Sequence, residues 1–208
     1  MRVILASASP ARLATLRSAG IEPEVRISGV DEDAVLAAAG DLATDAVVRL
    51  LARAKAEAVA TSLGEVSEDA VVLGCDSLLE LDGETHGKPG DATEAVARWR
   101  RMRGRRGVLH TGHWLVDLRD GHDGHDGVGG TSSTVVHFAD LTDAEIDAYV
   151  ATGEPLAVAG AFTIDGLGGP FVTGISGDHH GVVGLSLPLF RDLLGRLGVT
   201  VPELWVAR

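Results

Sequence analysis

The sequence predicts one α/β domain over residues 1–208, built on a mixed β-sheet with helices against it, and leaves an α+β arrangement open. A chain of 208 residues suits one well-buried core and is short for two. Hydrophobic residues make up 45% and aromatic residues only 4%, so the core must be mainly aliphatic. Strand-like and helix-like segments mix without strict βαβ repetition, which favours a mixed sheet.

The first part of the chain predicts a strand, a helix and a second strand. Residues 2–6 are apolar and indicate a short buried strand. Ser9 is an N-cap residue before Pro10, and Gly20 ends the helix that follows. Residues 22–28 alternate between apolar and polar, which predicts a strand.

The next segments predict a long helix and a buried strand. Residues 43–62 are rich in Ala, Val and Leu, with Arg and Lys at helical spacing, and Gly64 ends this helix. The apolar run 71–75 indicates a buried strand that residues 78–81 continue. Asp82-Gly83 is typical of a hairpin turn.

The rest of the chain alternates in the same way. Asp91 and Thr142 are N-cap residues for two further helices. The expected elements are a helix over 91–102, strands near 108–118 and 131–138, a helix over 143–151, Gly-rich strands and tight turns over 155–185, and a helix over 186–197. The His-Asp-Gly segment 121–127 reads as a hairpin loop, and its alternation lacks the rigid spacing of a metal site.

The net charge of −12 argues against polymeric nucleic acid and anionic membranes as partners. A small anion still fits if a few lysines gather locally. No apolar run approaches the roughly 20 residues needed to span a bilayer. Cys75 is the single cysteine, so no intrachain disulfide forms, and we expect a cytoplasmic protein.

Residues Ser7 to Arg12 open a helix directly after a strand. Free N–H groups of a first helical turn attract anions, and the hydroxyls of Ser7 and Ser9 with the guanidinium of Arg12 would sharpen this site for phosphate. The same residue types also suit a plain N-cap beside a surface arginine.

Asp76 follows the most apolar strand of the chain. A carboxylate is rare there unless it is paired or coordinates something, so it is a candidate metal ligand or base. A structural Asp that caps a turn is the alternative. Cys75 invites a nucleophile interpretation, which we reject because a small buried thiol on a strand usually only packs.

Two lysines and one acidic run are further candidates. Lys88 follows the hairpin, so an antiparallel return brings it back toward Asp76, while Lys55 lies in an Ala-rich helix. Both are candidate phosphate ligands, with solvated surface lysines as the alternative. The acidic run at 31–33 suggests a solvated loop, or a metal ligand that acts together with Asp76.

The order and spacing of these motifs closely resemble the Maf family of nucleotide pyrophosphatases, from about residue 3 to 197. The matching segments are Ser7 to Arg12, Val30-Asp31-Glu32, Leu51 to Ala56, Gly74 to Ser77, Asp82 to Pro89, Glu154 to Phe162 and Gly184 to Pro188. The resemblance implies an elongated mixed α/β fold similar to the inosine triphosphatases. It also implies a cytoplasmic enzyme that cuts between the α and β phosphates, in a family partly linked to arrest of septum formation.

The resemblance also assigns roles to residues. Asp76 matches the catalytic base, and Glu32 with Asp76 would hold a divalent cation, Mg or Mn. The phosphate pocket would be lined by Ser7, Ser9, Arg12, Lys55 and Lys88. A second copy of the chain is a candidate partner.

This chain departs from the family pattern at several positions. Ala11 replaces the first of two consecutive arginines, residues 103–107 lack a usual histidine, and Ala157-Val158 stand in place of Asp-Lys. The three positions that select the base hold Ala11, Ser77 and Asp165, which match neither known specificity branch. The reaction class is unaffected, whereas the preferred base, ordinary or modified, stays open.

We therefore expect a nucleoside triphosphate pyrophosphatase that cleans the nucleotide pool or arrests cell division. A regulator of septum formation that binds a nucleotide without turnover is the second hypothesis. A phosphomonoesterase with Asp76 as nucleophile is the third, although the chain lacks the Asp-x-Asp pair usual in such enzymes.

Overall fold

A mixed sheet forms the centre of the molecule in the computed structural model, which describes residues 1–64, 69–119 and 127–206. Its strands run in the order β2-β1-β3-β5-β6-β7, with β4 beside β3. They are β1 (Arg2–Leu5), β2 (Glu24–Val25), β3 (Ala70–Leu81), β4 (Glu84–His86), β5 (Arg106–Asp117), β6 (Gly127–Phe138) and β7 (Val172–Ser176). β1 is parallel to both β2 and β3, and the other pairs are antiparallel.

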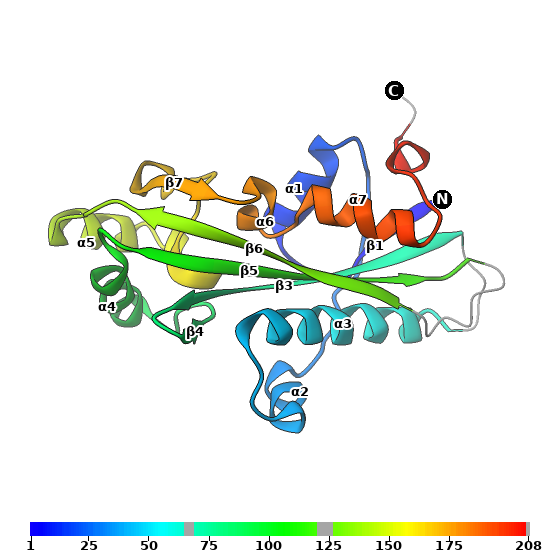
Figure 1. Cartoon of the computed structure of the whole chain (residues 1–208), viewed down its shortest axis with the longest axis horizontal. Helices are drawn as coiled ribbons and strands as arrows, with labels where there is room; N and C mark the ends of the chain where they lie inside the picture. The colour runs from blue at the N-terminus through cyan, green and yellow to red at the C-terminus, as the bar shows by residue number, and fades with distance from the viewer. Residues whose placement is uncertain (65–68, 120–126, 207–208) are drawn as a thin grey trace.

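Helices cover both faces of this sheet, as Figure 1 shows. The α-helices are α1 (Pro10–Ser18), α2 (Glu32–Ala39), α3 (Thr44–Ser62), α4 (Ala92–Met102), α5 (Asp143–Ala151), α6 (His179–Val183) and α7 (Leu187–Arg196). Short 3-10 helices are η1 (Glu154–Ala157), η2 (Ala159–Ala161), η3 (Gly169–Phe171) and η4 (Val201–Leu204). α3 lies on one face, α1, α6 and α7 lie on the other, and α4 and α5 lie at one end (Figure 1).

Two glycines let α3 approach the sheet closely. A Cβ atom on Gly74 would lie 2.0 Å from the carbonyl oxygen of Ala52, and one on Gly112 would lie 2.2 Å from that of Val48. Side chains two residues apart on a strand share a face, so Gly74 and Asp76 both point toward α3. The missing side chains therefore bring the backbone of α3 down beside Asp76.

Three clusters of buried side chains form the core, and β3 passes through all of them. Val71, Leu73 and Cys75 lie in a cluster with α1 and α7, while Val72 lies in a second cluster with α3. Leu79 and Leu81 belong to a third cluster with α4 and α5. Asp76 lies between the part of β3 that ends at Cys75 and the part that begins at Leu79.

The predicted α/β fold with a long mixed sheet flanked by helices is confirmed, since β3, β5 and β6 each contain 12 residues. The helices expected after Ser9, Asp91 and Thr142 are confirmed with those caps. The hairpin after β3 turns at Asp82 and Gly83, which both have positive φ angles.

Three expectations were wrong. The acidic run is not a loop, because Asp31 caps α2 by accepting from the Ala34 N–H at 3.0 Å. The strand expected at 22–28 is limited to β2, and the region 155–185 contains mainly short helices around one strand. The segment 121–127 lies outside the described residues apart from Gly127.

No helix in the described part of the chain is both long and apolar enough to cross a bilayer.

Candidate active site

Asp76 lies where one edge of β3 has no neighbouring strand. β1 accompanies this edge as far as the Leu5–Leu73 pair, and β4 joins it only at the Leu79–His86 pair. Between these pairs no described strand lies along this edge, where Arg12 binds the Cys75 carbonyl, although β5 continues along the other edge. A ligand can therefore reach the middle of β3 from this side without displacing a strand.

Lys55 joins two carboxylates at this opening. Its Nζ atom lies 2.6 Å from Asp76 Oδ1 and 2.8 Å from Glu32 Oε1. The Lys55 and Asp76 side chains are each 12% exposed, whereas Glu32 is 48% exposed. The structure thus brings together two of the predicted site residues in a buried ion pair, with the third on its solvent side.

Burial raises the pKa of Asp76, because the charged carboxylate loses solvation. The nearby cations Lys55 and Arg12 lower this pKa, and the Glu32 carboxylate raises it, but burial dominates. A carboxylate with a raised pKa is a stronger base than an ordinary aspartate, which suits proton abstraction from water.

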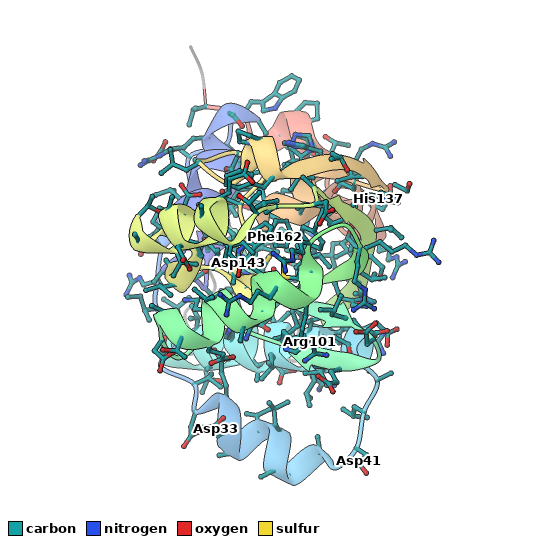
Figure 2. The ribbon with its side chains drawn as sticks, turned by 90° about the vertical axis from the view of Figure 1, so that its left-hand side faces the viewer. Asp33, Asp41, Arg101, His137, Asp143 and Phe162 are labelled. Carbon is teal, nitrogen blue, oxygen red and sulfur yellow. The ribbon has the colours of Figure 1, made fainter. Side chains whose placement is uncertain are left out.

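Glu32 contacts Lys55 from α2, a helix that packs little against the rest of the protein. No residue of α2 is buried, and Figure 2 shows Asp33 and Asp41, near its two ends, standing away from the body of the protein. The ion pair between Glu32 and Lys55 thus connects this helix to the centre of the site.

Arg12 connects three separate segments around Asp76. Its Nη1 donates to Ser7 Oγ at 3.1 Å and to the Cys75 carbonyl at 2.9 Å. Its Nη2 donates to Ser77 Oγ at 3.1 Å, and its Nε donates to the Gly184 carbonyl at 2.8 Å. Four of the five guanidinium protons are engaged within the protein.

Ser7 and Ser9 shape the turn into α1. Ser9 Oγ accepts from the Arg12 N–H at 3.4 Å, as expected of an N-cap, and the Ser9 N–H donates to Ser7 Oγ at 3.2 Å. Both side chains are partly exposed, so their oxygens stay near the surface of the site. Their phosphate-binding role stays a prediction.

Lys88 approaches the site from the opposite side. It follows β4, which runs antiparallel to β3, and so lies two residues past the His86–Leu79 pair toward Asp76. Its side chain is exposed, whereas the preceding backbone is fixed: the Gly87 carbonyl accepts from Arg98 Nη1 at 2.5 Å and from the Gly160 N–H at 3.1 Å.

The other expected specificity positions are less tightly connected. Asp165 is exposed in the loop between η2 and η3, and among the described residues it has no hydrogen bond to the site. Ala11 lies in the first turn of α1, one residue before Arg12, and is partly exposed. Ser77, the third specificity position, is the direct neighbour of Asp76 in β3 and accepts a hydrogen bond from Arg12.

Two buried polar residues of β5 were missed from the sequence. Thr111 contacts Ser77, with 3.0 Å between the two hydroxyl oxygens, and is fully buried. His113 Nε2 accepts from the Ser186 N–H at 2.8 Å, and burial lowers the pKa of His113 to about 4. Polar residues within an apolar strand were the available signal, because buried polar groups need partners.

The donor set fits a hard divalent cation. Asp76 and Glu32 present carboxylate oxygens to one positive group, the ammonium of Lys55. Among the described residues, no three His, Cys, Asp or Glu side chains are grouped for metal binding. Mg²⁺ commonly uses only one or two carboxylates and takes its other ligands from water and phosphate, so two suffice.

A solved structure with a similar chain trace is that of the Staphylococcus aureus Ham1 protein, at 14% identity and a TM-score of 0.44. The match covers 98% of this chain and 93% of that one. At this TM-score the similarity supports no statement about function.

Sequence relatives are much more similar. A protein of Streptomyces coelicolor is 57% identical, covering 98% of this chain and 94% of its own. One of Salinispora tropica is 56% identical, covering 99% and 88%. Both are named nucleoside triphosphate pyrophosphatase. The family model described as Maf-like protein matches residues 2–197, so this chain belongs to the Maf family.

Proposed function

We propose that this chain is a nucleoside triphosphate pyrophosphatase, which converts a triphosphate and water into a monophosphate and pyrophosphate. The observation that carries the proposal is the buried Asp76 carboxylate, paired with Lys55 and placed at the open edge of β3. The names of the relatives support the reaction class.

Each residue then has a distinct role. Asp76 accepts a proton from the water that attacks the α-phosphorus, while the pyrophosphate leaves from the opposite side. Lys55 and Lys88 balance the growing charge on the phosphate oxygens, which is where phosphoryl-transfer enzymes gain most of their rate. Ser7 and Ser9, with the N–H groups that begin α1, would bind further phosphate oxygens.

A divalent cation completes this proposal. Asp76 and Glu32 would hold Mg²⁺ or Mn²⁺. When bound, such a cation neutralises phosphate charge and lowers the pKa of a coordinated water. Lys55 is then free to turn its ammonium toward the phosphates, since both of its present partners would have another cation.

The first test replaces Asp76 with Asn and measures the release of pyrophosphate from a panel of nucleoside triphosphates with added Mg²⁺ or Mn²⁺. We expect loss of activity by at least about a hundredfold, because the base is removed while the shape is kept. Circular dichroism checks that the variant is folded. A folded variant with nearly full activity would rule out Asp76 as the base.

The products separate the competing hypotheses. Free phosphate as the first product would indicate a phosphomonoesterase. Triphosphate binding without any product would favour a regulator of septum formation. The same panel, with ordinary and modified bases, identifies the preferred nucleotide and so tests the contributions of Ala11, Ser77 and Asp165. We place the activity in the cytoplasm, in cleaning of the nucleotide pool or arrest of division.

A further inference from the structure

A hydrogen-bond chain of fixed direction runs from Arg12 into the sheet. Thr111 donates its one hydroxyl proton to the Gly181 carbonyl at 2.8 Å. At the Ser77–Thr111 contact of 3.0 Å the donor must therefore be Ser77. Ser77 has then used its only proton and accepts from Arg12 Nη2 at 3.1 Å. Every link from Arg12 to the Gly181 carbonyl is thus assigned.

The Arg12 guanidinium group contacts the residues on both sides of Asp76. Arg12 binds the carbonyl of Cys75 before Asp76 and the hydroxyl of Ser77 after it. Among the described residues, Arg12 has no hydrogen bond to the Asp76 carboxylate itself. Neighbouring side chains on a strand point to opposite faces, so Ser77 lies on the face opposite the Asp76 carboxylate. Arg12 therefore binds the strand on the side away from the reacting side chain.

We propose that Arg12 is a positioning residue, which Ser77 and the buried Thr111 hold against the strand that carries Asp76. This deepens the proposed function and rests on it, because it assigns to Arg12 a role other than the phosphate binding that the family resemblance implies. Four of the five guanidinium protons are already used. Ser77 then acts on the reaction through Arg12.

Arg12 also contributes its charge at this place. Asp76 is faced by Lys55 from α3, Glu32 from α2 and Arg12 from α1, and both cations lower its pKa. Loss of the Thr111 hydroxyl would remove the acceptor of the Ser77 proton, so Ser77 would turn and weaken its contact with Arg12. The carboxylate would then lose part of this support, and the strand around it would lose its fixed position.

Thr111→Val is the test, because Val keeps the shape and removes the hydroxyl of a residue too deeply buried to touch substrate. Thr134→Val is the matched control. Thr134 is 1% exposed, donates to the Asp178 carbonyl at 3.2 Å and accepts from the Asp178 N–H at 2.9 Å. It lies outside the chain from Arg12 but supports the same turn at α6.

We expect Thr111→Val to lower kcat by about tenfold or more with a nearly unchanged KM, because small misplacements of catalytic groups affect the chemical step. Thr134→Val should not show this loss of kcat. A raised KM with unchanged kcat, or equal behaviour of the two variants, would overturn the proposal.

Two further measurements keep the result decisive. If Thr111→Val does not fold, Ser77→Ala breaks the same chain at a partly exposed position and should give the same kcat loss. A crystal structure of the variant needs no turnover. It should show the Arg12 guanidinium displaced from the Cys75 carbonyl even if no triphosphate is hydrolysed, which separates failure of this proposal from failure of the proposed function.

Discussion

The pKa of Asp76 results from burial, which raises it, and from nearby cations, which lower it. Asp76 loses solvation through burial, and Lys55 and Arg12 only partly compensate for this loss. The aspartate is therefore kept more basic than usual without being left unpaired. Lys55 has the closest contact, so it is the group that most strongly opposes the rise in the pKa of Asp76.

Replacing Lys55 with Met should shift the acid limb of kcat/KM to higher pH. The base works only when deprotonated, so activity is lost as the pH falls through its pKa. Removal of the cation raises that pKa further. Arg53→Met is the control, because Arg53 lies on the same helix but pairs with Glu57 at 2.7 Å. An acid limb that stays in place or moves to lower pH in Lys55→Met would contradict this assignment.

The sequence could indicate Asp76 but not the partners of Arg12. A carboxylate after an apolar run is a local pattern that can be read directly. The Cys75 and Gly184 carbonyls that bind Arg12 are backbone atoms, which every residue type carries, and Gly184 is 172 positions away. Such contacts have no signature in composition or spacing.

Among the elements, α3 and β3 define the site by how closely they pack. Their existence follows from helical spacing and an apolar run, and both predictions were confirmed. The crossing point depends on Gly74 and Gly112, whose role appears only when two distant segments meet. The helix α2 was missed because three acids in a row are typical of solvated loops, although Asp31 is also a good cap.

Gly74→Ala should destabilise the protein and lower its activity together. The added methyl group would collide with the Ala52 carbonyl, so α3 must move, and overpacking of this kind costs about 1–3 kcal/mol. Thermal unfolding measures the change. Gly195→Ala in α7 is the control: nothing lies within 4 Å of its added methyl, so stability should rise by about 0.5–1 kcal/mol. Equal melting temperatures for Gly74→Ala and the wild type would contradict the packing argument.

In the whole molecule, Asp76 marks the border between groups of core residues. β3 and β5 continue across this border, so neither side has a sheet of its own. The prediction of one domain was made from chain length and from the lack of a linker that divides the sequence. The shared strands give it a physical reason, since separating the sides would expose the strands that both need.

Urea unfolding should therefore follow a single transition. Trp99 is fully buried in the cluster with α4 and α5, so its fluorescence reports that side once Trp114 and Trp205 are replaced with Phe. Far-UV circular dichroism of the same variant reports the whole chain. Coincident midpoints are expected, and two separate midpoints would show that the sides unfold independently.

The open edge at Asp76 has a mechanical consequence. Between the end of β1 and the start of β4, β5 is the one neighbouring strand of β3 in the described residues, and Arg12 binds the other edge at Cys75, so we expect β3 to bend most easily here. Ser7 lies on one side of this bend and Lys88 on the other, and a triphosphate that contacts both would act as a strut across it. Substrate binding would then stiffen the strand under the catalytic carboxylate at the moment when its position matters.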